Sequence, residues 1–386
     1  MMWQANMKVL IIGGYGRFGG NLAKLLSDCS ELHLYIAGRN LEKAKRFCDT
    51  YKGDARVTPV ALNRINIAPF LDTHSPDLVV DASGPFQIYG DAPYGVAIAS
   101  IEAGIDYVDL ADSTEFVANI ATLNTAAFEK ECFVLSGLST CPTLSSAAVE
   151  ALAQGQDITD IKIGIAPSPK AELGLSVVKA ILSYAGQKIE TLKNGKPDEV
   201  IGLTEGQRFQ IAPADYPPLE NRWFCAVEAP ELKLFPKHYP NLQNLWVGAG
   251  TRPEALLRLL SVLARLKAAL HLPTLTPLAK IAHKVLTLCQ FGPHRGGMLV
   301  EVKTTKGNFK STQSWHLIAE GDDGPLIPSI ATEILIRKIL AGNRPANGAR
   351  AAMNVLTLEE FETQFRKHRI VTRIKNENDT TINAFT

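Results

Sequence analysis

A glycine-rich turn near the start of the chain constrains the fold more than any other feature of the sequence. Residues 9–12, VLII, form a short aliphatic run that ends at glycine, which predicts a buried strand. The segment NLAKLL, which follows the glycines, places leucines at the spacing of one helix face. Between the two segments, Gly14, Gly16 and Gly19 have the spacing G-x-G-x-x-G. Because this pattern lies between a predicted strand and a predicted helix, it indicates a turn that binds the pyrophosphate of a dinucleotide.

Each of the three glycines has its own physical role in such a turn. Gly14 permits the tight reversal, Gly16 lets the backbone approach a pyrophosphate, and Gly19 lets the helix lie close to the strand. The helix then offers free N–H groups and the positive end of its dipole to the phosphates. The alternative is a structural turn without a ligand. We expect the cofactor to contact the whole turn, which comprises Gly14, Tyr15, Gly16, Arg17, Phe18 and Gly19.

The end of the second predicted strand, residues 32–40, bears on which dinucleotide is bound. An NAD site usually ends this strand with a carboxylate that binds the ribose hydroxyls, but here the position is Gly38. Arg39 follows, and a guanidinium matches the geometry of a 2′-phosphate. Asn40 and Arg17 can add further donors. The sequence therefore favours NADP over NAD, although Arg39 could instead be an ordinary solvated arginine at the start of a helix.

Further strands and helices alternate along the N-terminal part of the chain. A third strand, residues 55–62, precedes Asn63, and a fourth, residues 77–83, leads into Gly84 and Pro85. This order predicts an α/β fold with a Rossmann-type, doubly wound parallel sheet. Because ligands of such sheets cross the carboxyl ends of the strands, we expect further cofactor contacts there. A Gly-Pro pair is also ordinary loop punctuation. The expected contacts are Asn63, Ser83, Gly84 and Pro85.

Composition excludes several classes of function. The chain has 386 residues, which suits about two domains, and 40 basic against 39 acidic residues leave a net charge of +1. A nucleic-acid partner is therefore not expected. The six cysteines form no CxxC pair and no metal-binding spacing, so we expect no metal and a reducing, cytoplasmic location. The N-terminus lacks an apolar region of signal-peptide length, and no transmembrane run of about 18 apolar residues occurs.

Several motifs resemble the saccharopine dehydrogenase-like family of NAD(P)-dependent oxidoreductases, and its bacterial branch in particular. The matching segments are GGYGRFGG, AGRN, SGPFQIYG, AGIDYVDLAD, GLSTCPTLSSA, GPHRGGM and GDDGPLIPSIATEILIRKILAG. The resemblance implies a Rossmann domain, a second α+β domain with a mixed sheet, and a late helical segment that returns to the first domain. It also implies a homodimer formed through the second domain. Enzymes of the saccharopine type transfer a hydride to or from the carbon of a secondary amine or imine, but many relatives act on other substrates.

These features define the expected domain organisation. We expect a dinucleotide-binding domain over residues 1–150, a substrate and dimerisation domain over 151–325, returning helices over 326–370 and a flexible tail over 371–386. One of the C-terminal helices is predicted to begin with a capping box, in which Thr357 precedes Glu360 by three residues.

Two features of the second domain point to ligands or partners. Arg222 and Trp223 suit the binding of a carboxylate or an extended apolar acid, although Arg222 could instead pair with Glu220 or Glu228. The segment over residues 253–272 carries its polar residues in one narrow helical stripe and is otherwise mostly Ala, Leu and Val. Such a helix must bury most of its circumference. Domain core and dimer interface are the favoured explanations, and a peripheral membrane contact is the third.

Two hypotheses for the function follow. The first is an NADP-dependent oxidoreductase that transfers a hydride between NADP(H) and an imine, amine or carbonyl substrate. Tyr107 and Asp109, at the end of a predicted strand, are its candidates for a proton relay, with ring packing and loop capping as the alternative roles. The second is a non-catalytic NADP(H)-binding sensor or scaffold protein.

Overall fold

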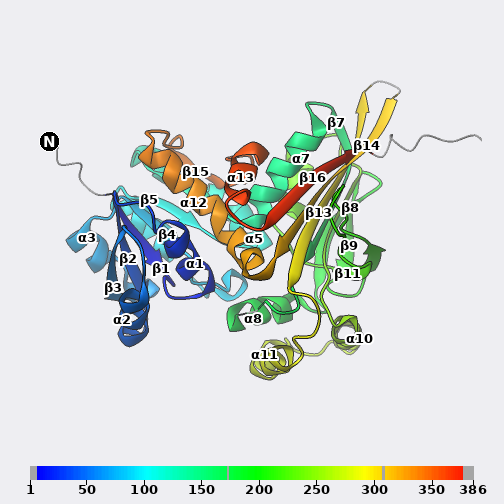
Figure 1. Cartoon of the computed structure of the whole chain (residues 1–386), viewed down its shortest axis with the longest axis horizontal. Helices are drawn as coiled ribbons and strands as arrows, with labels where there is room; N and C mark the ends of the chain where they lie inside the picture. The colour runs from blue at the N-terminus through cyan, green and yellow to red at the C-terminus, as the bar shows by residue number, and fades with distance from the viewer. Residues whose placement is uncertain (1–6, 172–173, 307–308, 377–386) are drawn as a thin grey trace, which may run out of the picture. The chain divides into compact units, whose positions relative to one another are not determined.

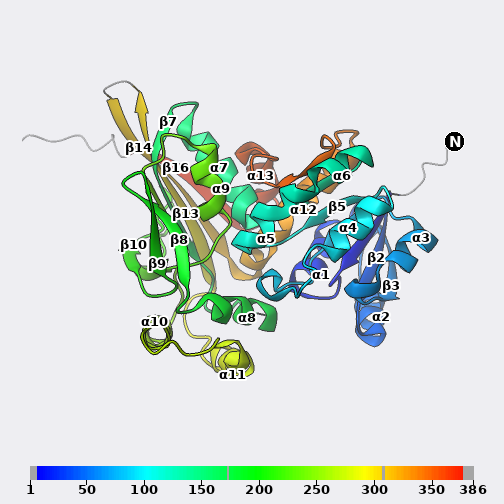
Figure 2. The same cartoon turned by 180° about the vertical axis from the view of Figure 1, so that it is seen from behind.

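In the computed structural model, the chain forms two compact units (Figures 1 and 2). The structure describes residues 7–171, 174–306 and 309–376. The first unit contains the described residues up to Leu144 together with Pro325–Leu356. The second unit contains Ser145–Gly324 and the described residues from Thr357 onward.

A seven-stranded parallel sheet forms the centre of the first unit (Figure 1). Its strand order is β15-β6-β5-β4-β1-β2-β3, with β1 between β2 and β4. This order confirms the predicted doubly wound sheet. The strands are β1 (Met7–Ile12), β2 (Leu32–Gly38), β3 (Arg56–Ala61), β4 (Leu78–Asp81), β5 (Asp106–Asp109), β6 (Phe133–Ser136) and β15 (Gly348–Ala351).

Helices follow the strands of this sheet. Every residue of β2 and β4 is buried, as expected of parallel strands whose two faces are both covered, and this is why they are so rich in aliphatic residues. The helices of the first unit are α1 (Arg17–Leu25), α2 (Leu41–Thr50), α3 (Ala68–His74), α4 (Gly95–Glu102), α5 (Thr114–Asn119), α6 (Asn124–Glu129) and α12 (Ile327–Leu340).

The helix α12 comes from the far end of the chain and packs against α1. The Asn21 side chain donates to the carbonyl of Pro325 at 2.9 Å. The Ser329 hydroxyl donates to the carbonyl of Phe18, also at 2.9 Å. Both bonds fix the helix that follows the glycine-rich turn, so the C-terminal segment supports the first unit near its most constrained loop.

A mixed nine-stranded sheet forms the second unit, which confirms the predicted α+β fold. Its main path is β10-β11-β12-β7-β13-β14-β16, and β8 joins β12 to β9. The strand β7 pairs parallel with β12 and antiparallel with β13. The strands are β7 (Asp157–Ala166), β8 (Lys188–Lys193), β9 (Lys196–Ile201), β10 (Gly206–Phe209), β11 (Arg222–Ala226), β12 (Asn244–Ala249), β13 (Arg295–Lys306), β14 (Phe309–Glu320) and β16 (Ile370–Asn376).

Three helices of the second unit pack on one another. Leu260 of α10 and Leu286 of α11 pack against a small core that contains Leu182 of α8. Among the described residues, none of the helices combines the length and the apolar content that crossing a bilayer requires. The helices of this unit are α7 (Ser145–Ala153), α8 (Leu175–Tyr184), α9 (Glu231–His238), α10 (Glu254–Ala269), α11 (Ala279–Leu288) and α13 (Leu358–Phe365).

The C-terminal part of the chain corrects two expectations. Residues 326–370 do not all return to the first domain, because α13 and β16 belong to the second unit, where α13 contacts α7. Residues 371–376 are not a flexible tail, because they extend β16, which pairs with β14 in the antiparallel register that sets Ile370 opposite Ala319. The rest of the predicted tail, residues 377–386, lies outside the described residues.

Candidate functional site

The glycine-rich turn lies where the strand order of the first sheet reverses, between β2 and β4. The N–H groups of Gly13 and Gly14 both donate to the carbonyl of Ala37 in β2, at 2.8 and 3.0 Å. The N–H of Gly16 donates back to the carbonyl of Gly13 at 2.8 Å. Gly13 has a φ of 77°, a conformation that favours glycine. These bonds fold the turn against β2, and α1 begins directly after it, at Arg17.

The turn has almost no room for side chains. A Cβ atom on Gly19 would lie 2.5 Å from the carbonyl oxygen of Gly13, and one on Gly14 would lie 2.8 Å from that of Ile11. A Cβ on Gly16 would lie 3.0 Å from the Gly13 oxygen. Gly16 is the N-cap of α1 and supplies no capping side chain. Bare backbone and an uncapped helix N-terminus therefore meet at one point, which fits a pyrophosphate.

Gly38, which ends β2, is buried against Tyr15. A Cβ on Gly38 would lie 2.5 Å from an atom of the Tyr15 ring. The N–H of Asn40 donates to the Tyr15 hydroxyl at 3.0 Å, while its side-chain oxygen accepts from the N–H of Lys43 and caps α2. Arg39 is exposed. The Tyr15 ring therefore leaves no space for a carboxylate side chain at position 38. The exposed guanidinium of Arg39 suits a 2′-phosphate.

A buried polar network at the end of β4 was not found by sequence reasoning. Asp81 is fully buried, and its Oδ1 accepts from the Ser83 N–H at 2.9 Å and from the Ser83 hydroxyl at 2.6 Å. The Tyr89 hydroxyl donates to Oδ2, and the Arg64 guanidinium lies 3.3 Å from the centre of the Tyr89 ring. Burial raises the pKa of Asp81. The network fixes the loop of residues 82–89, and the aspartate just before SGPF was the sequence signal for it.

The remaining predicted cofactor residues lie at the ends of neighbouring strands. Asn63 follows β3 and caps a short helical turn, with its side-chain oxygen accepting from the N–H of Ile65 at 3.3 Å. Ser83, Gly84 and Pro85 follow β4 and are partly buried. Since the carboxyl ends of parallel strands meet at one edge of a sheet, the predicted residues share the edge that carries the glycine-rich turn.

A family model matches the N-terminal part of the chain. Residues 9–137 match the model described as the saccharopine dehydrogenase NADP binding domain. This segment is therefore similar to that domain family. The match confirms the predicted NADP-binding domain and the family resemblance over this segment. No curated protein matches the chain.

One solved structure shows a similar fold over nearly the whole chain. The apo saccharopine dehydrogenase (L-Glu forming) from Saccharomyces cerevisiae matches with a TM-score of 0.67 and 13% identity, over 96% of this chain and 99% of that one. An engineered D-amino acid dehydrogenase bound to NADP+ matches with a TM-score of 0.44 and 14% identity, over 90% and 94% of the two chains. The amine dehydrogenase from Mycobacterium smegmatis matches with a TM-score of 0.46 and 11% identity, over 89% and 94%.

Tyr107 and Asp109 lie inside the NADP-binding domain rather than on its surface. Tyr107 is 1% exposed and Asp109 is fully buried. Oδ1 of Asp109 accepts from the N–H of Ala111 at 3.0 Å, the N–H of Gly137 at 2.8 Å and the hydroxyl of Ser136 at 2.9 Å. These bonds join the ends of β5 and β6. Burial raises the pKa of Asp109 to about 7 and raises that of Tyr107 well above its ordinary value.

Arg222 and Trp223 in the second unit do not converge on one place, because consecutive residues of β11 point to opposite faces of the sheet. The indole of Trp223 covers Gly206. Arg222 is 2% exposed, and its Nε and Nη1 atoms have no hydrogen-bond partner among the described residues. Glu220, one of the two acids considered as its partner, instead pairs with Arg252.

The surroundings of Arg222 are rich in positive charge. Burial lowers the pKa of Arg222, and the neighbouring Arg252 and Arg295 lower it further, while Glu220 acts in the opposite direction. Arg295 pairs with Glu320 at 2.7 Å. Each neighbouring arginine thus has a carboxylate, whereas Arg222 shows no ion pair within the described part of the chain.

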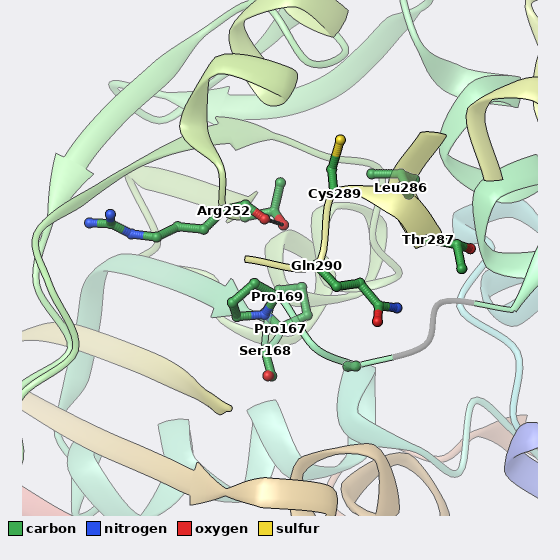
Figure 3. Close-up of a pocket in the computed structure, with 10 residues that line it drawn as sticks. Pro167, Ser168, Pro169, Arg252, Leu286, Thr287, Cys289 and Gln290 are labelled. Atoms are coloured by element: carbon green, nitrogen blue, oxygen red, sulfur yellow. Dashed lines mark hydrogen bonds between the residues drawn. The ribbon is translucent and has the colours of Figure 1, made fainter. Parts of the chain in front are cut away.

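Arg252 also borders a small pocket of the second unit (Figure 3). Proline and serine from the segment after β7 form one side of this pocket, and the last turn of α11 with the residues after it forms another. Figure 3 shows the Arg252 side chain extending away from Cys289 and Gln290. The lining residues are Pro167, Ser168, Pro169, Ala171, Thr251, Arg252, Leu286, Thr287, Cys289 and Gln290.

Proposed function

We propose that this protein is an NADP-dependent oxidoreductase that transfers a hydride between NADP(H) and an imine, amine or carbonyl substrate. The observation that carries the proposal is the turn from Gly14 to Gly19, where bare backbone meets an uncapped helix N-terminus at the reversal of strand order. The family of residues 9–137 supports the same conclusion. The nicotinamide supplies the hydride, and the protein supplies binding, orientation and electrostatics.

Different residues of the NADP-binding domain would bind different parts of the cofactor. The backbone of the turn would bind the pyrophosphate, while Arg39, with Arg17 and Asn40, would bind the 2′-phosphate. The placement of Tyr15 over Gly38 supports NADP rather than NAD, because it leaves no space for a ribose-binding carboxylate. Asn63, Ser83, Gly84 and Pro85 would contact the remaining cofactor from the ends of β3 and β4.

Hydride transfer to an imine or carbonyl also requires a proton, and the candidates to supply it are buried side chains. Tyr107 and Asp109 remain the candidates for a proton relay, but the three hydrogen bonds that Asp109 accepts support a positioning role for it at the ends of β5 and β6. The Asp81 network with Ser83 and Tyr89 likewise would hold the loop after β4. A substrate carbonyl or imine beside this loop would be oriented by fixed backbone.

Arg222 gives the proposal a substrate class. A buried guanidinium without an ion pair is costly, and a carboxylate matches its fork of N–H donors. We therefore assign Arg222 to an acidic group of the substrate, with Arg252 and Arg295 adding positive potential. The opposite orientation of Trp223 along β11 supports a packing role for that side chain.

The proposal also covers the oligomeric state and the cellular location of the protein. We infer a homodimer that uses the second unit, and sedimentation of the purified protein would test it. All six cysteines are free thiols, which supports a reducing, cytoplasmic location.

Calorimetric titration with NADPH and NADH, followed by a screen for NADPH consumption, tests the function. We expect NADPH to bind more tightly than NADH, and Gly16→Ala to weaken NADPH binding at least tenfold because its methyl group would stand where the phosphates approach. Gly95→Ala is the matched control, because no atom lies within 4 Å of its added Cβ. If NADPH binds but no amine, imine or carbonyl compound supports turnover, the protein is a sensor or scaffold instead. If neither cofactor binds, the proposal fails.

A further inference from the structure

The helices α10 and α11 expose an unusual amount of apolar surface. Of the 17 large apolar side chains that are exposed among the described residues, 11 lie between Leu259 and Phe291. Leu259 is 56% exposed, Leu270 is 64% exposed and Leu288 is 70% exposed. Scattered apolar residues are normal on a protein surface, but a group concentrated in one helical pair marks an interaction surface. We call the exposed side chains of residues 259–291 the α10–α11 surface.

The exposed apolar side chains of α10 form one face of the helix. Leu259, Leu263, Leu266 and Leu270 recur at intervals of four and three residues, so they lie in one stripe. The opposite face carries the buried residues, which include Leu257, Ser261, Ala264 and Lys267. The domain-core explanation of this apolar helix therefore does not hold for the stripe of leucines, which is exposed in the described chain.

The packing of the buried face keeps this stripe pointing outward. The Lys267 side chain is buried and donates to the carbonyl of Ala185 at 2.8 Å, which ties α10 to the chain after α8. Leu260 and Leu286 pack with the core on α8. Rotation of α10 to bury its leucines would break the hydrogen bond of Lys267 and expose the face that is now buried. The α10–α11 surface is therefore a fixed feature of the second unit.

The charges on the same segment are almost all positive. Residues 253–293 contain five lysines and arginines and one acid, Glu254, and of these cations Lys267 is buried and does not belong to the surface. Glu254 already pairs with Arg208 and Arg258. Lys280 and Lys284 are exposed on α11 next to Ile281, which is 65% exposed. The α10–α11 surface thus combines an apolar stripe with a basic margin.

The combination of an apolar stripe with a basic margin distinguishes between two possible partners, a second copy of the chain and a lipid bilayer. A second copy of the chain would bring the same cations to a self-complementary contact, where like charges oppose each other. An anionic lipid surface complements both parts, since its headgroups attract lysine and arginine while the leucines enter the boundary of the acyl chains. We propose that the α10–α11 surface binds the protein peripherally to anionic bilayers. This inference does not rest on the proposed enzymatic function.

Co-sedimentation of the full chain with vesicles tests the proposal. We expect the protein to bind vesicles of 70% phosphatidylcholine and 30% phosphatidylglycerol at least tenfold more tightly than pure phosphatidylcholine vesicles, with binding weakened by salt. The variant Leu259→Asp/Leu288→Asp is expected to lose at least tenfold of this binding. Phe128→Asp is the matched control, because Phe128 is 67% exposed but lies on α6 of the first unit. The control is expected to bind as the wild type does.

Two further measurements keep the test decisive. Thermal unfolding and NADPH binding of the double variant should match the wild type, because the changed residues are exposed. Light scattering without lipid separates the membrane from a dimer interface. A wild-type dimer that becomes monomeric in the double variant would overturn the proposal, and so would absent vesicle binding or equal binding by the double variant.

The charge-reversal variant Lys280→Glu/Lys284→Glu tests the basic margin. It should lose the preference for anionic vesicles, and an unchanged preference would also count against the proposal.

Discussion

The ring of Tyr15 occupies the place where a side chain at Gly38 would begin, with a ring atom 2.5 Å from the ideal Cβ position. The hydroxyl of the same tyrosine accepts from the N–H of Asn40 at 3.0 Å. One aromatic side chain of the glycine-rich turn therefore fills the site of the usual ribose-binding carboxylate and also fixes the start of α2. Cofactor preference in this chain thus rests on packing as well as on charge.

The first prediction concerns this pair. Gly38→Asp alone should weaken NADPH binding by more than about tenfold, because the carboxylate repels the 2′-phosphate and displaces Tyr15. In Tyr15→Ala/Gly38→Asp, the carboxylate has room to meet the ribose, and the ratio of NADPH to NADH affinity should shift by about a hundredfold toward NADH. Calorimetry with both cofactors measures the ratio. Tyr15→Ala alone should still prefer NADPH, and an unchanged preference in the double variant would refute the argument.

The second prediction concerns the contact between α1 and the turn. Gly19→Ala should destabilise the first unit by about 1–3 kcal/mol, because its methyl group would lie 2.5 Å from a backbone oxygen that cannot rotate away. Denaturant unfolding followed by circular dichroism measures the loss. Gly95→Ala provides the comparison in the same unit, and it should leave the stability unchanged or raise it slightly, because Gly95 begins α4 and its added methyl group meets no atom. Equal stability of the two variants would show that the turn relaxes more easily than its geometry indicates.

The third prediction concerns the pH dependence of stability through Asp109. Burial raises its pKa in the folded chain to about 7, well above the ordinary value for an aspartate. Below pH of about 4 the carboxyl is protonated in both the folded and the unfolded state. As the pH rises to about 7, the unfolded chain ionises freely while the folded chain must bury a charge, so the stability contributed by Asp109 is lost across this window.

Asp109→Asn removes that ionisation and keeps an oxygen acceptor for the three hydrogen bonds. The melting temperature of the wild type relative to the variant should therefore fall between about pH 4 and pH 7 and level off above it. Calorimetric scans at matched ionic strength test this. A constant difference across the range would mean that the carboxyl titrates normally in the folded chain.

The fourth prediction concerns Arg222. Dicarboxylic and amino-dicarboxylic compounds at millimolar concentration should raise the melting temperature of the wild type but not that of Arg222→Met. Without ligand, Arg222→Met should be as stable as the wild type or more stable, because it removes a buried cation that has no ion pair among the described residues. Arg373→Met, on the edge strand β16, changes an exposed arginine and should keep the ligand response. Equal responses from all three proteins would exclude Arg222 as an anion-binding residue.

Features that depend on neighbours in sequence were predictable. The strand, turn and helix around Gly14 follow from a local hydrophobic pattern and from glycine spacing. The capping box is equally local, and Thr357 and Glu360 form it as predicted, with the Thr357 N–H donating to the Glu360 carboxylate at 2.8 Å. In both cases, the interacting residues lie within a few positions of each other, so the pattern contains most of the physics.

Features that depend on distant pairing were not predictable. The strand β15 has the sequence GARA, which carries no strand pattern, and it exists because β6 offers it a parallel edge. The strand β16 has no alternating burial, since its neighbours Arg373 and Ile374 are both exposed, and it is fixed by its register with β14. The burial of Arg222 likewise results from loops and strands that the sequence does not place near it. Tertiary contacts therefore determined what local propensity left open.

The chain passes between the units three times, after Leu144, Gly324 and Leu356, and this bears on how the protein is made. The first unit takes its seventh strand, β15, and the helix α12 from residues 327–351, which follow nearly the whole of the second unit. A ribosome that has released only the first 150 residues therefore presents a parallel sheet with an open edge. A gene fragment that ends at that point lacks β15, the strand that pairs with the edge of β6. The complete first unit therefore forms only after translation has passed Leu356.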